Sequence, residues 1–319
     1  MIEEAVYQRA RAFIIAGDLF DSERITRSNA ERVLGAMARY PYLDFLYLSG
    51  NHEKSALTEC GVALPDNLKI FGNDWTYFDY GEVMIAGRSE TCPDMFKTLD
   101  LGYEKTNIVV LHGALADGRT SGEIIGKKDL EGKCVSYLAL GHYHSYSKHE
   151  IGDTGIAVYA GTPEGRGFDE VGEKGFVMID ADGRRASHTF VPFAKRTLRA
   201  VEVDLTGACS RAEINSRVDA ALRGIPHTDL IRVILTGKRS PELFADVDAI
   251  KSRWQNSFYH FEIKDESSIR IDPEDYKYDR SLKGEFIRLV TSKTDISDVE
   301  RDKIIRTGLA ALMGEFDEI

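Results

Sequence analysis

The sequence has few cysteines, and they lie far apart. Its 319 residues include four of them, Cys60, Cys92, Cys134 and Cys209, and no two form a Cys-x-x-Cys pair. This spacing argues against a disulfide framework and against a cysteine-based zinc site. Free thiols are typical of proteins in a reducing compartment, so we expect a cytoplasmic protein.

Long apolar runs are also missing. The longest have four to six residues, which is too short to cross a membrane. The first twelve residues carry Glu3, Glu4, Arg9 and Arg11, whereas a secretory signal needs an apolar core. We therefore expect neither a membrane span nor a secretory signal.

An excess of basic charge is the third absence, because the net charge is −11. A protein that grips DNA by itself gains most of its affinity by neutralising phosphates, so we expect no tight DNA binding by this chain alone. The negative net charge still allows a nuclease, since clustered carboxylates bind metal ions and a partner can supply a basic surface.

The first two-thirds of the chain alternates short apolar strands with loops that end in Gly, Asp, Asn or His. Apolar runs without alternation indicate strands that are covered on both faces. Helices are expected at residues 2–11 and from Thr26, as N-cap, to about Arg39. A layered α/β sandwich follows from this order. The expected strands are residues 13–16, 45–48, 83–86, 108–111, 137–140, 145–149, 156–160, 175–180 and 187–193.

The composition changes near Lys195, after which strands and helices alternate over residues 197–264. The helix expected at 211–222 opens with a capping box of Ser210 and Glu213. The next helix, expected at 241–253, opens with Ser240 as N-cap and Pro241 at its first position. Strands are expected before, between and after these two helices, at 198–205, 229–236 and 258–264.

Two further helices are expected at residues 281–291 and 298–313. The second has a capping box of Ser297 and Glu300. Its apolar face comprises Val299, Ile304, Ile305, Leu309 and Leu312. The chain thus divides into residues 1–195, a small α+β domain at 196–268, and terminal helices within 269–319.

Four short motifs follow the apolar strands, at the position where open α/β sheets place their ligands. In each, a glycine that permits a tight turn lies beside an oxygen or imidazole ligand. A lone histidine after a strand is most often structural, but four such turns in one fold indicate a metal site. Asp, Asn and His together suit Mn²⁺, Fe²⁺ or Zn²⁺ better than Ca²⁺. The motifs are Gly17-Asp18-Leu19-Phe20-Asp21, Gly50-Asn51-His52-Glu53, Leu111-His112-Gly113 and Gly141-His142-Tyr143-His144.

This order of motifs resembles the calcineurin-like metallophosphoesterase superfamily. Residues 160–168 (AGTPEGRGF) and Lys174-Gly175-Phe176 are similar to segments of the SbcD-type DNA-repair exonucleases. The resemblance implies a four-layer α/β/β/α nuclease domain, a capping domain, and terminal helices that hold the coiled-coil base of an ATPase partner.

The resemblance also implies two divalent metal ions, with Mn²⁺ favoured. Asp18 would bridge the two ions, and His144 would belong to the second site. The remaining ligands of the first site would be Asn51, His112 and His142.

Two more residues take roles from the resemblance. His52 would stabilise the transition state or protonate the leaving oxygen, and Asp21 would orient it. The alternative for Asp21 is an ordinary loop residue. Arg119 and Arg166 lie in loops near the motifs, where they either contact DNA phosphate or are simply solvated. The histidines that match no ligand turn, expected on strands or at the surface, are His149, His188, His227 and His260.

One departure from the family is plain in the sequence. Family members begin with a strand that ends in Asp-x-His, but here no such motif occurs and no histidine precedes His52. The second metal site would keep only Asp18 and His144, which weakens it. Either Met1 is an internal start of a longer gene, which we favour, or the chain is a shortened homologue. An upstream reading frame without Asp-x-His would defeat the first explanation.

The sequence therefore predicts the nuclease subunit of an SbcCD-like DNA-repair complex, cleaving DNA phosphodiesters as a 3′→5′ exonuclease. Single-strand endonuclease activity is a further activity to test. Its partners would be DNA, an SbcC-like ATPase of the SMC family, and a second nuclease subunit. The alternatives are a phosphoesterase acting on small molecules and a non-catalytic scaffold for the ATPase.

Overall fold

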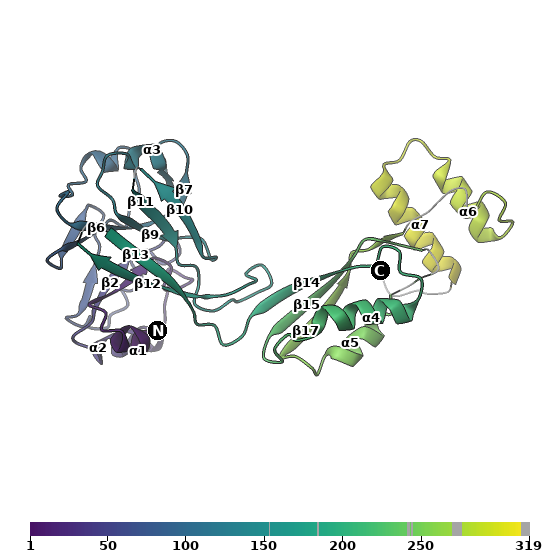
Figure 1. Cartoon of the computed structure of the whole chain (residues 1–319), viewed down its shortest axis with the longest axis horizontal. Helices are drawn as coiled ribbons and strands as arrows, with labels where there is room; N and C mark the ends of the chain where they lie inside the picture. The colour runs from purple at the N-terminus through teal and green to yellow at the C-terminus, as the bar shows by residue number, and fades with distance from the viewer. Residues whose placement is uncertain (153, 184, 241–242, 244, 270–275, 314–319) are drawn as a thin grey trace. The chain divides into compact units, whose positions relative to one another are not determined.

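The computed structural model describes residues 1–152, 154–183, 185–240, 243, 245–269 and 276–313 (Figure 1). The chain forms two compact units. The first comprises Met1–Gly165 and Glu173–Ala194, and the second comprises Arg166–Gly172 and Lys195–Ile319. The segment at 166–172 therefore belongs with the second unit, although it precedes the end of the first. The three-part division expected from the sequence stays a prediction.

Two sheets form the centre of the first unit. The three-stranded sheet has the order β1-β2-β3, and all its strands are parallel. The six-stranded sheet has the order β10-β11-β9-β6-β5-β4. Their strands are β1 (Ala12–Ala16), β2 (Asp44–Leu48), β3 (Leu68–Ile70), β4 (Thr76–Asp79), β5 (Val83–Gly87), β6 (Thr106–His112), β9 (Tyr137–Gly141), β10 (Ser147–Ile151) and β11 (Gly155–Tyr159).

The two sheets pack face to face because alternate residues of each strand point to opposite sides. Leu46 and Leu48 of β2 contact the same core as Ile108 and Val110 of β6. In the described part of the chain β1 pairs with β2 alone, so it forms one edge of its sheet. All five residues of β1 are only partly buried.

Helices cover the outer face of the three-stranded sheet. These are α1 (Ile2–Tyr7) and α2 (Arg27–Ala38), and α1 ends earlier than residue 11, where the sequence placed its end. The Thr26 hydroxyl accepts the backbone N–H of Asn29 at 3.2 Å, which confirms the predicted N-cap. The helix buries one face against the sheet through Ala30, Leu34 and Met37.

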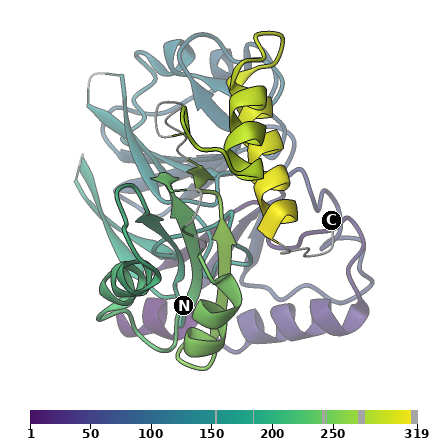
Figure 2. The same cartoon turned by 90° about the vertical axis from the view of Figure 1, so that its right-hand side faces the viewer.

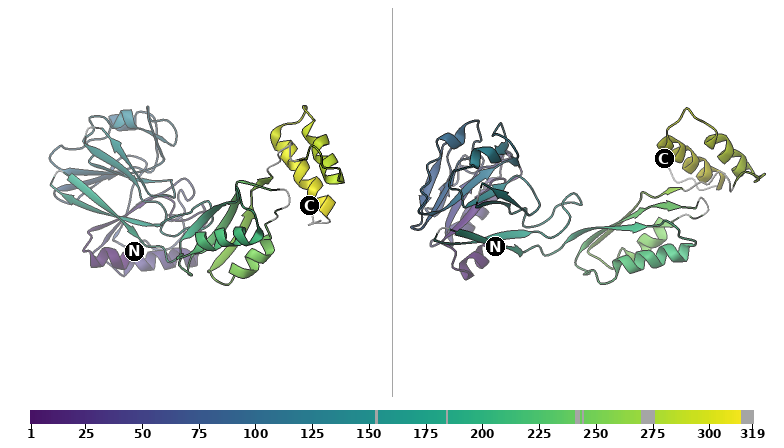
Figure 3. Two further views of the ribbon diagram at one scale, coloured as in Figure 1. Left: turned by 45° about the vertical axis from the view of Figure 1, so that its right-hand side comes forward. Right: turned by 45° about the horizontal axis from the view of Figure 1, so that its top comes forward.

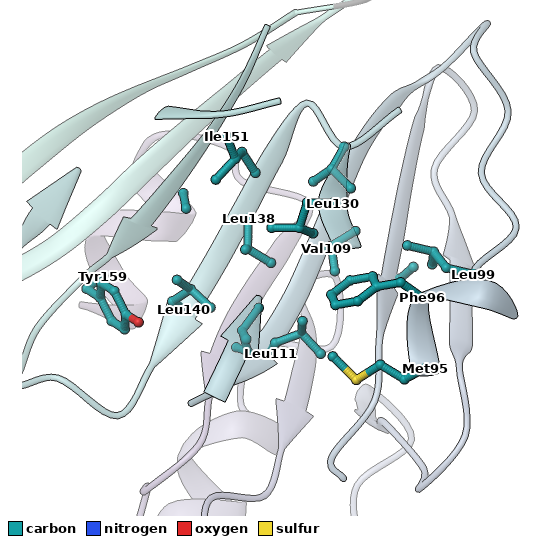
Figure 4. Packing of buried hydrophobic residues seen from close by; sticks show 14 residues of the cluster. Met95, Phe96, Leu99, Val109, Leu111, Leu130, Leu138, Leu140, Ile151 and Tyr159 are labelled. Carbon is teal, nitrogen blue, oxygen red and sulfur yellow. The ribbon is translucent and has the colours of Figure 1, made fainter. Parts of the chain in front are cut away.

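The outer face of the six-stranded sheet carries the fourth layer. Figure 4 shows Phe96 and Met95 packed over Val109 and Leu111, which lie on the sheet. The layers therefore run helix, sheet, sheet and an outer layer of short helices and strands, and the predicted α/β sandwich is confirmed. The outer layer comprises η1 (Met95–Lys97), β7 (Ala114–Ala116), β8 (Ile124–Gly126) and α3 (Lys127–Leu130).

A hairpin completes the first unit. Its antiparallel strands are β12 (Gly175–Asp182) and β13 (Arg185–Pro192). Val177 and Ile179 of β12 pack against the core between the two sheets. On β13, the ring of His188 contacts Tyr137 and Tyr146, and its Nε2 lies 3.0 Å from the Tyr146 hydroxyl.

Acidification should lower the stability of this hairpin. Burial, together with the nearby Lys148 charge, lowers the pKa of His188 from 6.5. The unfolded chain therefore binds more protons than the folded one just below pH 6.5, and stability falls as the pH drops through that window. In His188→Gln, thermal unfolding midpoints at pH 7.5 and 5.5 should differ less than in the wild type. An equal or larger drop in the variant would contradict this assignment.

In the second unit, parallel strands β14 (Leu198–Asp204), β15 (Leu230–Thr236) and β17 (His260–Asp265) form a sheet. Helices α4 (Arg211–Leu222) and α5 (Val247–Trp254) lie along one face of it (Figure 3). Short strands β16 (Lys238–Arg239) and β18 (Ser268–Ile269) pair with each other. The core includes Val203, Ile214, Val218, Val233, Ile250 and Phe261.

Of the two helix starts of this unit, one agrees with the sequence prediction and the other does not. The predicted cap of α4 is confirmed, since Ser210 accepts the N–H of Glu213 at 3.2 Å. For α5 the prediction of a start after Ser240 is wrong, because the helix begins at Val247. Its cap is Asp246, whose side chain accepts the Ala249 N–H at 2.9 Å. Pro241 lies outside the described residues.

Helices α6 (Leu282–Thr291) and α7 (Asp298–Met313) lie side by side (Figure 2). The predicted capping box of α7 is confirmed, since Ser297 and Glu300 each accept the other's backbone N–H. The predicted apolar face is only partly correct. Ile305 and Leu309 are buried against α6, but Val299 is 80% exposed, and Ile304 and Leu312 are 39% and 42% exposed. Among the described helices, none is long and apolar enough to cross a membrane.

Candidate metal centre

The four motifs follow the carboxyl ends of four strands, two in each sheet of the first unit. β1 and β2 run parallel in one sheet, and β6 and β9 run parallel in the other. Because the two sheets face each other, the turns after these strands meet at one end of the sandwich.

His112, at the end of β6, connects these turns. Its side chain is buried, and its Nδ1 lies 2.9 Å from the Ala16 carbonyl oxygen at the end of β1. Its Nε2 lies 2.9 Å from Asn51 Oδ1 and 3.3 Å from Asp18 Oδ2. The ring of His142 lies 5.5 Å from that of His112, centroid to centroid. The structure thus brings together the four residues predicted to form the first metal site.

The contacts of His112 indicate what this cluster can hold. Since the Ala16 carbonyl can only accept, Nδ1 carries a hydrogen and donates it. In a neutral imidazole, Nε2 then has a lone pair, and that lone pair faces two oxygen atoms. With the Asn51 oxygen turned towards Nε2, a proton on Nε2 or a metal ion among the three atoms would relieve their repulsion, whereas a turned amide would donate its N–H to Nε2 instead. Fixing the tautomer through a carbonyl is a common arrangement for metal-binding histidines.

The donor separations suit a metal ion. Neighbouring ligands at about 2.1 Å from an octahedral ion lie about 3 Å apart, close to the 2.9 Å and 3.3 Å found here. Among the described residues, no group of three or more His, Cys, Asp or Glu side chains is arranged to hold an ion. The role of Asn51 as a metal ligand stays a prediction.

Ionisation of the cluster follows from the same contacts. Burial alone would raise the pKa of Asp18, but His112 and the backbone N–H of His52 outweigh it and lower that pKa. Burial alone would lower the pKa of His112, but bonding to Asp18 and Ala16 outweighs it and raises that pKa. Both shifts favour a charged pair, so the cluster stabilises a carboxylate together with a positive charge.

The motif glycines are needed because the loops approach closely. A Cβ on Gly17 would lie 2.2 Å from His112 Nδ1, and a Cβ on Gly50 would lie 2.1 Å from Asp18 Oδ1. Either side chain would push a donor out of the cluster. The backbone is also strained at two predicted donors, since φ is 54° at Asp18 and 96° at His142. Such left-handed residues are found at functional sites, where the surroundings hold them in place.

Glu53 positions two of the donor loops, a role that the sequence did not suggest. The side chain is fully buried, and its carboxylate accepts the backbone N–H groups of Leu19, Phe20 and Gly50 at 3.0, 2.8 and 3.3 Å. These residues flank Asp18 and Asn51 in the chain. Burial raises the pKa of Glu53 overall, although the backbone N–H groups that donate to its carboxylate act to lower that pKa. The motif itself was the only available signal, since it contains this glutamate.

Replacing Glu53 with alanine should loosen both loops. Buried donors left without acceptors cost free energy, so we expect the free energy of unfolding to fall by about 3 kcal/mol. Mn²⁺ affinity should fall about 10- to 100-fold, as it does when residues supporting metal ligands are lost. Chemical denaturation and Mn²⁺ titration measure the two effects.

The control for this variant is Glu170→Ala. Glu170 is also buried and accepts a backbone N–H, that of Arg166 at 3.0 Å, but it belongs to the second unit. The Glu170→Ala variant should have a lower free energy of unfolding and the Mn²⁺ affinity of the wild type. Equal Mn²⁺ affinities in the two variants would contradict the positioning role of Glu53.

His52 lies at the edge of the cluster. Its backbone N–H donates to Asp18 Oδ1 at 3.3 Å, while its imidazole Nδ1 lies 3.8 Å from Asp21 Oδ1. The two side chains are 54% and 66% exposed, so the imidazole is accessible to a substrate. The 3.8 Å separation is longer than a hydrogen bond, so the predicted role of Asp21 in orienting His52 stays a prediction.

The other predicted site residues are placed less directly. The carbonyl of His144 accepts from the Lys174 ammonium at 2.6 Å, and the role of its imidazole as a ligand stays a prediction. Arg119 forms an ion pair with Asp129 at 3.1 Å in the outer layer. Arg166 belongs to the second unit and pairs with Glu170 at 3.8 Å. The roles of both arginines as DNA contacts also stay predictions.

Comparisons with known proteins bear on this α/β sandwich with Asp, Asn and His side chains gathered at the strand ends. No family model matches the chain. Over 262 residues it is 23% identical to a Bacillus subtilis protein named uncharacterized metallophosphoesterase YhaO. Over 218 residues it is 24% identical to the DNA double-strand break repair protein Mre11 of Methanosarcina acetivorans.

These likenesses are distant and partial. They cover 74% and 60% of this chain, and 62% and 34% of the respective relatives. The chain therefore spans less than two-thirds of either relative. Together the two support the calcineurin-like metallophosphoesterase superfamily, a class of phosphoesterases and nucleases that use divalent metals.

Proposed function

We propose that this chain is a metal-dependent DNA phosphodiesterase, the nuclease subunit of an SbcCD-like repair complex. The observation that carries the proposal is the convergence of Asp18 and Asn51 on Nε2 of His112, with His142 alongside. The likeness to a repair protein, Mre11, favours DNA as the substrate.

Asp18, Asn51, His112 and His142 would hold one divalent ion, with Mn²⁺ the favoured metal. Asp18 and His144 would contribute to a second. Such ions activate water at neutral pH and neutralise charge on the phosphoryl oxygens.

The residues around the cluster supply positioning and proton transfer. The backbone of His52 is fixed by its bond to Asp18, which leaves the exposed imidazole beside the reacting phosphate. Asp21 Oδ1, 3.8 Å from the imidazole Nδ1, would orient the ring. His52 can then stabilise developing negative charge or donate a proton to the leaving oxygen.

The partners follow from charge and exposure. With a net charge of −11, this chain would bind duplex DNA tightly only when another subunit supplies a basic surface. Leu282 and Leu289, on α6, are 70% and 60% exposed, and they lie on the helix pair that we propose as the docking site of an SbcC-like ATPase. A second nuclease subunit would complete the assembly.

Digestion of a labelled DNA hairpin tests the proposal. We expect cleavage that Mn²⁺ stimulates and a chelator abolishes, with slower turnover of a small phosphodiester. Faster turnover of the small diester would favour a small-molecule phosphodiesterase instead. No more than one metal ion per chain, together with no Mn²⁺-stimulated cleavage, would favour the scaffold.

A further inference from the structure

Tyr143 lies beside the donor cluster and is held there by other rings. It follows His142 in the turn after β9, and its side chain is 49% exposed. Its ring centroid lies 5.2 Å from that of His142 and 4.8 Å from that of Tyr159. Tyr143 is therefore supported on two sides and still open to solvent.

The support under Tyr143 is rigid. Tyr159 is fully buried, and its hydroxyl accepts the Leu115 N–H at 2.7 Å and donates to the Gly113 carbonyl at 2.8 Å. Because Gly113 directly follows His112 in the chain, these bonds fix Tyr159 to the strand end that carries a predicted metal ligand. The position of Tyr143 relative to the cluster is thus set by packing.

Two other partly exposed tyrosines of the first unit, Tyr77 and Tyr146, are each 37% exposed. Tyr42 and Tyr103 are 97% and 72% exposed, as solvated side chains are. Tyr143 instead combines a partly accessible ring with a fixed position next to the place where a phosphodiester would bind.

We propose that Tyr143 stacks on an unpaired nucleobase next to the scissile phosphate, so that the substrate is single-stranded nucleic acid or a melted duplex end. The inference rests on the proposed function and deepens it. Every base has a π-face, so stacking on an aromatic ring binds single strands with little sequence preference. A chain of net charge −11 gains little from phosphate contacts, and stacking supplies affinity that its charge does not.

A binding measurement separates stacking from phosphate contacts. Fluorescence anisotropy in Mn²⁺ compares a cleavage-resistant phosphorothioate oligothymidylate with an abasic oligomer of equal length and charge. The wild type should prefer the oligomer with bases. Tyr143→Ala should weaken its binding by about 5- to 150-fold and lose the preference. Tyr143→Phe and the control Tyr103→Ala should keep both the affinity of the wild type and its preference for the oligomer with bases.

Either of two results overturns the inference: no preference for bases in the wild type, or binding by Tyr143→Ala within twofold of the wild type. Mn²⁺-dependent hairpin cleavage then separates this failure from that of the proposed function. If the wild type cleaves and Tyr143→Ala has an unchanged KM, the stacking role fails while the nuclease stands. If the wild type neither binds DNA nor cleaves it, both fail.

Discussion

Asp18→Asn is expected to lower Mn²⁺-dependent cleavage of a DNA hairpin by about 10³-fold. Under the proposed function Asp18 bridges two ions, and losing that carboxylate would remove several kcal/mol of metal-supplied stabilisation. Mn²⁺ affinity, measured by titration, should also fall. The amide keeps the shape of the carboxylate but not its charge. The expected loss is therefore electrostatic.

The matched control is Asp44→Asn. Asp44 lies in the same unit, and its side chain is 25% exposed, against 21% for Asp18. It bonds Lys69 and Tyr80, away from the donor turns. This variant should bind Mn²⁺ and cleave like the wild type. Wild-type Mn²⁺ affinity in Asp18→Asn would remove Asp18 from the metal site.

His52→Ala is expected to lower kcat by about 10²- to 10⁴-fold, the usual contribution of a positioned proton donor. Mn²⁺ affinity should change little, because only the imidazole is removed and the bond to Asp18 comes from the backbone of His52. Steady-state cleavage and Mn²⁺ titration on one preparation separate the two effects. A loss of kcat without a loss of Mn²⁺ affinity is the expected pattern.

His260→Ala provides a close comparison for this variant. His260 Nε2 lies 3.8 Å from Glu262 Oε2, and His52 Nδ1 lies 3.8 Å from Asp21 Oδ1. The side chains of His260 and His52 are 52% and 54% exposed. It belongs to the second unit, outside the donor cluster. If both variants cleave at similar rates, His52 has no part in the chemistry.

Strands and turns were predictable because their signals are local. The apolar runs that became β2, β6 and β9 have no alternation, and each is followed by a glycine or histidine turn. The sandwich follows from these runs, since strands buried on both faces need layers on both sides. The four donors could be selected as a group for the same reason, and their role as metal ligands remains a prediction.

The supports of the site could not be predicted, because they depend on contacts between distant parts of the chain. Glu53 accepts from Leu19 and Phe20, which precede it by 34 and 33 positions. Tyr159 bonds Gly113 across 46 positions. Neither contact leaves a periodic or spaced pattern. Only the fold brings these residues together.

The wrong predictions come from local signals that competed. Ser240 followed by Pro241 has the form of a helix start, but Asp246 caps α5 instead. Val299 fits the apolar pattern of α7, yet it is 80% exposed because the contact with α6 uses a narrower stripe. Helix periodicity identifies a helix well and its partner surface less well.

The left-handed backbone at Asp18 and His142 has a consequence for engineering. A non-glycine residue held in such a conformation costs about 1–3 kcal/mol. Glycine adopts it freely, so a selection for thermal tolerance alone should enrich His142→Gly even as it removes a predicted metal ligand. Heat-resistant variants that retain their chemistry should therefore carry their changes elsewhere, and selection must score turnover together with melting temperature.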